Sequence, residues 1–212
     1  PWPYPYAMDR EKGIEAYQTM ITAEAYKLRL AQGDTEGLAH EYKIDGDAPV
    51  LPVTISKVAE MAPGLTRYEL SDPDGKPLPE WTAGGHIDIV VAPEFLRQYS
   101  LAGDPADRSK YVIGVLREDD GKGGSKLLHR IFGEGRKIFI SKPINHFPVA
   151  ETSGKHWLMG GGIGVTPMIA MAHELHARGR DFALHYSFSK RASAGFLTEL
   201  ADVPWKDKIS LY

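Results

Sequence analysis

A cluster of glycines at residues 160–165, with the sequence GGGIGV, is the strongest chemical signal in the chain. It follows a short apolar segment and precedes Thr166 and Pro167, which suit the N-cap and the first position of a helix. Glycines let the backbone approach a ligand closely, and free amides at a helix start attract a pyrophosphate. A tight strand-to-helix turn without a ligand is the alternative. The strand before the cluster and the capped helix after it favour nucleotide binding.

The segment RQYSL at residues 97–101 is a second signal, in a stretch that reads as a strand. Alternation along a strand sends Arg97 and Tyr99 to the same face, so a guanidinium could pair with a phosphate while a phenol ring lies along a flat cofactor. Ser100 adds a backbone amide and a hydroxyl. By itself the segment is more often an ordinary strand with a surface arginine. Its combination with the glycine cluster favours a cofactor.

The loop DDGKGGS at residues 119–125 precedes a short helix that we expect over residues 127–133. Consecutive glycines, a hydroxyl and a helix N-terminus can form a cradle for an anion, and this one would suit a phosphomonoester. A flexible hairpin tip would have the same composition. The residues of the loop leave both interpretations open.

His173 and His176 stand three residues apart in a stretch that we expect to be helical. A metal site would need a third ligand at helical spacing, and the sequence offers none there. A helix that covers a sheet commonly shows such residues to solvent. We therefore expect no metal site in this chain.

The elements that must position these residues fall into two groups, of which the first is a set of short strands rich in Val, Ile, Thr and Tyr. Turn signals such as DPDG at residues 72–75 separate them. Evenly spaced short strands of this kind predict an antiparallel six-stranded barrel. The expected strands cover residues 52–58, 66–70, 86–91, 97–102, 111–117 and 137–140.

After residue 148 strands alternate with helices, which predicts a doubly wound parallel sheet. The expected elements are a strand at 155–159, a helix at 167–178, a strand at 182–188, a helix at 195–200 and a strand at 208–211. Tyr212 comes about half way through the five or six strands that such a domain usually carries, so we expect a truncated α/β domain whose remainder is missing.

The first fifty residues differ from both groups. Residues 1–8 are rich in proline and aromatic residues, and residues 9–31 carry an apolar helical stripe that includes Ile14 and Tyr17. The stripe predicts an amphipathic helix, which could pack on its own domain or dock to a partner subunit. The expected domains are an N-terminal extension at 1–48, a barrel at 49–150 and a partial α/β domain at 151–212.

Composition narrows the classes of partner and compartment. With 25 Lys and Arg against 28 Asp and Glu, the net charge of −3 argues against nucleic acid as a partner. The absence of a membrane-length apolar run and of a secretory signal makes a cytoplasmic protein without membrane contact the expectation. The chain has no cysteine, which excludes disulfides and thiolate-held iron–sulfur clusters within these residues.

These motifs occur in the order and context of one family. Over residues 50–212 the chain resembles the ferredoxin–NADP reductase superfamily, most closely its phthalate dioxygenase reductase and vanillate demethylase reductase branch. The segments that carry the resemblance are RQYSL at 97–101 (flavin motif), AGGHID at 83–88 (the segment before that motif), GGS at 123–125 (flavin-phosphate loop), PINHFP at 143–148 (domain junction) and 161–168 (nicotinamide loop). The stretch before Pro49 has no counterpart in that branch.

The resemblance implies FMN in the barrel, with FAD as the alternative, and NADH in the α/β domain. It also implies a plant-type [2Fe–2S] domain beyond Tyr212. Arg97 and Ser125 would then hold the flavin phosphate, and Tyr99 would stack on the isoalloxazine. Ser100 would hydrogen-bond near flavin N5 and Thr166 would lie where nicotinamide meets flavin, which makes these two the candidate catalytic residues.

The cofactor-binding set extends to neighbouring positions. Basic residues after the second strand of the α/β domain, Lys190 and Arg191, could accommodate a 2′-phosphate, so NADPH is the alternative to NADH. Both residues could also be ordinary solvated charges. The full set is Arg97, Gln98, Tyr99, Ser100, Leu101, Val115, Arg117, Lys122, Gly123, Gly124, Ser125, Gly161, Gly162, Ile163, Gly164, Thr166, Pro167, Ser189, Lys190 and Arg191.

The expected function is that of a flavin-dependent NAD(P)H oxidoreductase, the reductase component that passes electrons to an oxygenase or demethylase, or to another acceptor protein. Hydride transfer needs positioned rings more than acids and bases, which agrees with the lack of a visible catalytic triad. The alternatives are a stand-alone reductase that reacts with a diffusible acceptor and a scaffold subunit that keeps the fold without catalysis.

Overall fold

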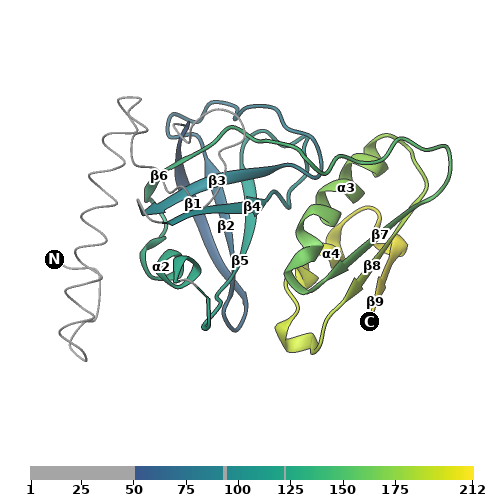
Figure 1. Ribbon diagram of the computed structural model, residues 1–212. Coiled ribbons are helices and arrows are strands. Elements are labelled where there is room, and N and C mark those ends of the chain that lie inside the picture. Colours follow the sequence, from purple (N-terminus) through teal and green to yellow (C-terminus); the bar gives the residue numbers. More distant parts are fainter. Residues whose placement is uncertain (1–50, 93–94, 122) are drawn as a thin grey trace.

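The computed structural model describes residues 51–92, 95–121 and 123–212 of the chain (Figure 1). The N-terminal extension, with the amphipathic helix predicted at 9–31, lies outside the described residues. So does Lys122. Within the described part, the chain forms two sheets that lie side by side, one antiparallel and one parallel.

The first sheet has six antiparallel strands in the order β4-β3-β6-β1-β2-β5, which confirms the predicted six-stranded architecture. Alternate residues of the strand at 65–71, such as Tyr68 and Leu70, are buried while Arg67 and Glu69 are partly exposed, as expected for a strand with one face toward a core. A bridge between Leu101 and Ile113 connects the two edges of the sheet and so closes the barrel. The strands are β1 (Leu51–Ala62), β2 (Leu65–Ser71), β3 (His86–Ala92), β4 (Phe95–Ser100), β5 (Tyr111–Leu116) and β6 (Lys137–Ile140).

Helix α2 (Gly124–Ile131) crosses one end of the barrel, where it contacts β3 and β4. The sequence placed this helix at 127–133, which was wrong at both ends. It begins earlier because Gly123 adopts a left-handed conformation, with φ of 91°, that turns the chain directly into the helix. It ends earlier because Phe132 is extended.

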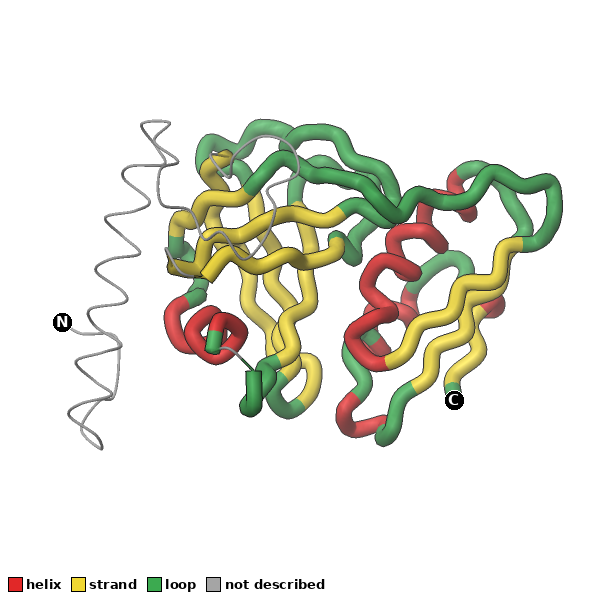
Figure 2. Tube along the Cα trace, in the orientation of Figure 1, coloured by secondary structure: helices red, strands yellow, loops and turns green. Residues whose placement is uncertain are grey.

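The second sheet is parallel, in the order β7-β8-β9, and its helices α3 and α4 cover one face (Figure 2). Strand–helix alternation was predicted correctly. The second helix starts later than expected because Phe196 takes a left-handed φ of 62° just before it. The elements are β7 (His156–Gly161), a 3-10 turn (Gly162–Val165), α3 (Thr166–Ala177), β8 (Phe182–Ser187), α4 (Leu197–Asp202) and β9 (Ile209–Leu211).

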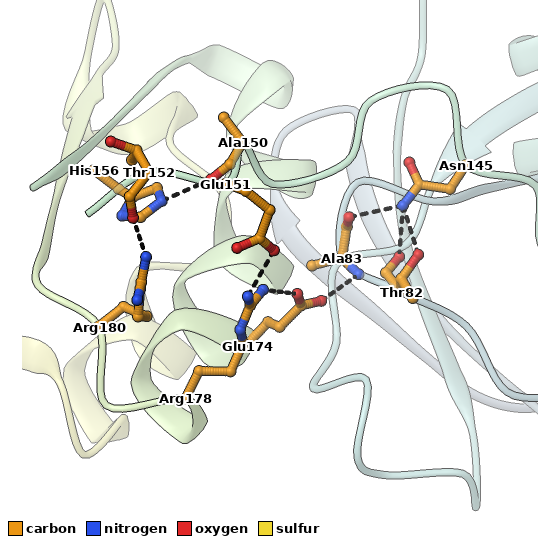
Figure 3. Close-up of polar contacts among 10 residues, drawn as sticks. All are labelled: Thr82, Ala83, Asn145, Ala150, Glu151, Thr152, His156, Glu174, Arg178 and Arg180. Carbon is orange, nitrogen blue, oxygen red and sulfur yellow. Dashed lines mark hydrogen bonds and ion pairs between the residues drawn. The ribbon is translucent and has the colours of Figure 1, made fainter. Parts of the chain in front are cut away.

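Polar contacts join the two sheets at the segment between them (Figure 3). Asn145 donates from Nδ2 to the Thr82 hydroxyl at 2.6 Å and to the Ala83 carbonyl at 2.9 Å. The Ala83 amide in turn donates to Glu174 Oε2 of α3 at 2.9 Å. Arg178 pairs with the other oxygen of Glu174 at 3.1 Å. The segments around residues 83 and 145 are distant in the sequence. In the fold they contact each other, and the first of them also contacts Glu174 of α3.

Two partly buried histidines make stability depend on pH. Burial lowers the pKa of His129, whose Nε2 lies 3.1 Å from the Val115 carbonyl oxygen. Burial also lowers the pKa of His173. The negative charge of Asp104, 3.9 Å away, offsets this lowering only in part. The unfolded chain therefore binds protons more readily than the folded chain as pH falls below the ordinary histidine value of 6.5. We expect the free energy of unfolding to decrease from pH 7.5 to pH 5.5.

Urea denaturation at these two pH values measures the effect. Replacing His129 by glutamine removes one such titration, so the variant should lose less stability on acidification than the wild type. Arg130→Gln, at the neighbouring exposed position on α2, serves as the matched control and should keep the wild-type dependence. Equal losses in the His129 variant and the wild type would contradict the assignment.

Candidate cofactor-binding cleft

A cleft of about 430 Å³ opens between the barrel and the parallel sheet. It brings together the three segments that the sequence singled out, at 97–101, 119–125 and 160–167. The glycine turn (residues 160–165) and the strand that bears Arg97 thus face each other across one shared space, as predicted. The lining residues are Arg97, Gln98, Tyr99, Ser100, Gly114, Leu116, Glu118, Gly123, Gly124, Ser125, Ile163, Gly164, Thr166 and Pro167.

The barrel side of the cleft holds Arg97 against the start of α2. A Cβ atom on Gly124 would lie 2.4 Å from Arg97 Nε, so the guanidinium rests where any other side chain would clash. Arg97 Nη1 donates to the Leu96 carbonyl at 2.8 Å, and this hydrogen bond fixes the orientation of the guanidinium group. A guanidinium beside the first amides of an eight-residue helix fits an anion such as a phosphate.

Ser125 completes this end of the cleft. Its Oγ accepts a hydrogen bond from the Glu118 amide at 3.1 Å, which ties the loop back to the end of β5. The hydroxyl hydrogen remains available to an acceptor in the cleft. Of the two interpretations that the sequence left open, this arrangement favours the anion cradle over a flexible hairpin tip.

Four consecutive residues of β4, from Arg97 to Ser100, line the cleft. Alternation predicted only Arg97 and Tyr99 on one face. The cleft is therefore bordered by residues of both alternating sets, Gln98 and Ser100 as well as Arg97 and Tyr99. A flat ring placed here would therefore meet the Tyr99 side chain and the polar groups of Gln98 and Ser100.

Gly114, in the middle of β5, lets the glycine turn approach the barrel. A Cβ atom at this position would lie 2.9 Å from Ile163 Cδ1 and 2.9 Å from Phe196 Cε2. The sequence reasoning missed Gly114, as it missed Leu116 and Glu118, although a glycine inside a strand is itself a sign of close approach. At Gly114, therefore, the α/β domain contacts the barrel directly, at the edge of the cleft.

The far wall of the cleft differs from the prediction in one respect. Thr166 is not the N-cap of α3 but its first residue, with φ of −53°, and Pro167 is the second. The reason is that residues 162–165 form a 3-10 turn that runs directly into the helix. The Thr166 hydroxyl donates to the Ile163 carbonyl at 3.0 Å, so it holds the turn rather than capping the helix.

Several predicted cofactor residues of the barrel lie outside the cleft. Leu101 and Val115 are fully buried in the barrel core. Arg117 is exposed and pairs with Asp119 at 3.1 Å. The cofactor roles given to these three residues therefore have no support from the lining of the cleft.

The remaining predicted residues belong to the α/β domain. Gly161 borders a separate hollow with Ser187 at the carboxyl ends of β7 and β8, and Gly162 lies exposed in the 3-10 turn. Ser189 and Lys190 are exposed. Arg191 lines a different groove, beside β1 and α4.

The described residues contain neither a metal-binding cluster nor a membrane-spanning helix. Within 51–92, 95–121 and 123–212, His, Asp and Glu side chains form no group of three that could hold a metal ion. His173 instead packs edge-on against Trp205, with ring centroids 5.1 Å apart. In the same part of the chain, every helix is too short or too polar to cross a bilayer.

Comparison with curated proteins finds relatives along most of the chain. The tert-butanol monooxygenase / tert-amyl alcohol desaturase reductase subunit of Aquincola tertiaricarbonis is 38% identical over 162 residues, which cover 76% of this chain and 48% of the relative. The vanillate O-demethylase oxidoreductase of a Pseudomonas strain is 37% identical over 163 residues, 77% of this chain and 51% of the relative. The chain thus spans about half the length of the curated relatives it matches.

A solved structure shows the same fold. Phthalate dioxygenase reductase, described as a modular structure for electron transfer from pyridine nucleotides to [2Fe–2S], superposes with a TM-score of 0.73 and 35% sequence identity. The match covers 76% of this chain and 51% of the solved chain. No family model matches the sequence.

Proposed function

Because this chain belongs to the ferredoxin–NADP reductase superfamily, in the branch that contains phthalate dioxygenase reductase and vanillate O-demethylase oxidoreductase, we propose that it works as the reductase component of an oxygenase system. It takes electrons from NADH through a flavin held in the barrel and delivers them to an oxygenase partner. The observation that carries the proposal is the single cleft in which Arg97, Gly124 and Thr166 meet.

Some residues of the cleft bind the cofactor, and others hold the two walls of the cleft in position. Arg97, the first amides of α2 and Ser125 bind the flavin phosphate, and Tyr99 packs along the isoalloxazine. Ser100 offers a hydrogen bond on the side that faces the glycine turn, and Thr166 keeps that turn in place. When bound, flavin supplies N5 as the acceptor of a hydride from nicotinamide C4 and can release the two electrons singly.

The proposed cofactors are FMN and NADH. FMN is favoured over FAD because the phosphate end of the cleft offers one arginine and one helix start, a set that suffices for a single phosphomonoester. NADH is favoured over NADPH because neither Lys190 nor Arg191 lines the hollow at Gly161 and Ser187. The hollow at Gly161 and Ser187 is the candidate position for the remainder of the nucleotide.

Onward electron transfer belongs to the whole protein. The 212 residues contain no cysteine, so a [2Fe–2S] cluster held by thiolates would need residues beyond Tyr212. An oxygenase component is the proposed partner, as the names of the relatives suggest. A cytoplasmic location remains a prediction.

The test is to purify the protein, release any cofactor by heat and identify it by mass, then mix the flavin-loaded protein with NADH or NADPH without oxygen. The proposal expects FMN and faster bleaching of the flavin absorbance with NADH. FAD or faster bleaching with NADPH would overturn only the cofactor choice. Protein that stays colourless with added FMN and FAD would support the scaffold alternative instead.

Thr166 provides a prediction about the rate of reduction. Thr166→Val keeps the shape of the side chain but removes the donor to the Ile163 carbonyl, which loosens the glycine turn. Losing one such hydrogen bond should slow flavin bleaching roughly tenfold while flavin stays bound. Thr166→Ser retains the hydroxyl and should stay near the wild-type rate. Stopped-flow absorbance under anaerobic conditions measures both variants, and an unchanged rate in the valine variant would remove Thr166 from the site.

A further inference from the structure

Arg67 of β2 and Gly114 of β5 are direct partners across the ladder between these strands. Directly opposed residues of an antiparallel pair project on the same face of the sheet. Gly114 is the position at which Ile163 of the glycine turn and the ring of Phe196 rest on the barrel. Arg67 therefore stands next to the point where the α/β domain touches β5.

Arg67 links the two domains through charge. Its Nε lies 3.1 Å from Glu199 Oε1 on α4, and its Nη1 donates to Glu69 Oε1 at 2.5 Å. The side chains of Arg67 and Glu69 are 13% exposed, and that of Glu199 is 39% exposed. An ion pair with one largely buried member is screened less by salt than a pair at the open surface.

Glu69 keeps Arg67 in place. Partial burial would raise the pKa of Glu69, but the hydrogen bonds and charges of Arg67 and Lys110 outweigh burial and hold this pKa below its usual range. Lys110 Nζ lies 3.2 Å from Glu69 Oε2, the carboxylate oxygen that Arg67 does not use. The Arg67 guanidinium is thus fixed from the barrel side, and its contact with Glu199 is an ion pair without a hydrogen bond from Nε.

The segment that leads into α4 is packed tightly on the barrel beside this ion pair. A Cβ atom on Gly195 would lie 2.6 Å from Leu65 Cδ2. Phe196 is buried, and its amide donates to Met61 Sδ at 3.3 Å. Its left-handed φ of 62° is a conformation that a phenylalanine keeps only when its surroundings hold it there.

We propose that Arg67 and Glu199 are positioning residues for flavin reduction. Their interdomain ion pair, with Phe196 beside it, fixes the α/β domain against Gly114 and so sets how closely the glycine turn faces β4. Neither residue borders the cleft, so neither would contact a flavin held there. This inference rests on the proposed function, because the spacing of the two walls matters only if rings must meet between them.

The test compares Glu199→Gln, which removes the charge, with Glu199→Arg, which places a second cation beside Arg67. Glu80→Gln is the matched control, because Glu80 pairs with Arg108 at 2.9 Å within the barrel and its side chain is 83% exposed. Two properties are measured in each protein. One is backbone hydrogen exchange in residues 162–166 and 196–200, and the other is the rate of flavin bleaching at saturating NADH, with flavin affinity determined separately.

We expect faster exchange in both segments and bleaching slowed roughly tenfold in Glu199→Arg, less in Glu199→Gln, with flavin affinity unchanged. Glu80→Gln should match the wild type in every measurement. Unchanged exchange and bleaching in Glu199→Arg would overturn the inference, as would a loss confined to flavin affinity. If flavin-loaded wild type is bleached by neither nucleotide, the proposed function fails, and unchanged exchange in Glu199→Arg would still refute the interdomain ion pair.

Discussion

Arg97→Ala should leave the protein with greatly weakened flavin binding. The guanidinium lies against Gly124 at the start of α2, where it would meet the flavin phosphate. A hydrogen bond to a charged group contributes about 1.5–3 kcal/mol, so affinity should fall on the order of 10- to 100-fold. Titration of flavin-free protein with FMN, followed by the quenching of flavin fluorescence, measures the change.

Arg117→Ala is the matched control for this experiment. Arg117 is another arginine of the barrel, but it is exposed, pairs with Asp119 at 3.1 Å and lies outside the cleft. Its removal should leave flavin affinity within about twofold of the wild type, as is usual for an exposed ion pair. Nicotinamide binding should change little in Arg97→Ala. Equal losses of flavin and nicotinamide affinity in Arg97→Ala would contradict the assignment of Arg97 to the phosphate.

Gly114→Val should slow flavin reduction strongly while leaving the flavin bound. The new side chain would begin 2.9 Å from both Ile163 Cδ1 and Phe196 Cε2, and Phe196 is buried and cannot easily yield. The glycine turn would be pushed away from the barrel. Because a misplacement of about 1 Å can cost roughly 100-fold in rate, we expect bleaching by NADH to slow between about 10- and 100-fold.

The same substitution at Gly133 separates this effect from a general loss of stability. A Cβ atom on Gly133 would meet nothing within 4 Å, so Gly133→Val should reduce flavin at the wild-type rate. Both variants are compared by anaerobic stopped-flow absorbance after their flavin content has been matched. A Gly114 variant that bleaches as fast as the Gly133 variant would show that close approach at β5 does not limit the reaction.

The strands could be predicted because they depend on local patterns. The meeting of the three motifs followed instead from the resemblance to a known family. Period-two burial marks a strand such as β2, and the glycine turn keeps its place between a strand and a helix. The 3-10 turn before Thr166 was not predicted, because the same residues are compatible with a loop that ends in a capped helix and with a 3-10 turn that continues into the helix. Boundaries of α2 and α4 depended on backbone conformations at Gly123 and Phe196 that composition does not reveal.

Other parts of the cleft depended on tertiary neighbours. Gly114 matters because the glycine turn lies over that strand, and nothing within β5 identifies what lies opposite. Leu101, the last residue of the segment at 97–101, and Val115 were both assigned to the cofactor, but both side chains are buried in the barrel core. Arg67 and Glu199 are 132 positions apart in the numbering of the chain, and only the packing of α4 on β2 pairs them.

Determining the crystal structure of the flavin-loaded protein, with a nicotinamide analogue that cannot donate hydride, tests the central claim most directly. We predict that the flavin phosphate lies between Arg97 and Gly124 and that the two rings stack between Tyr99 and the glycine turn. Rings found apart from each other, or a flavin whose phosphate lies away from Arg97, would contradict this account.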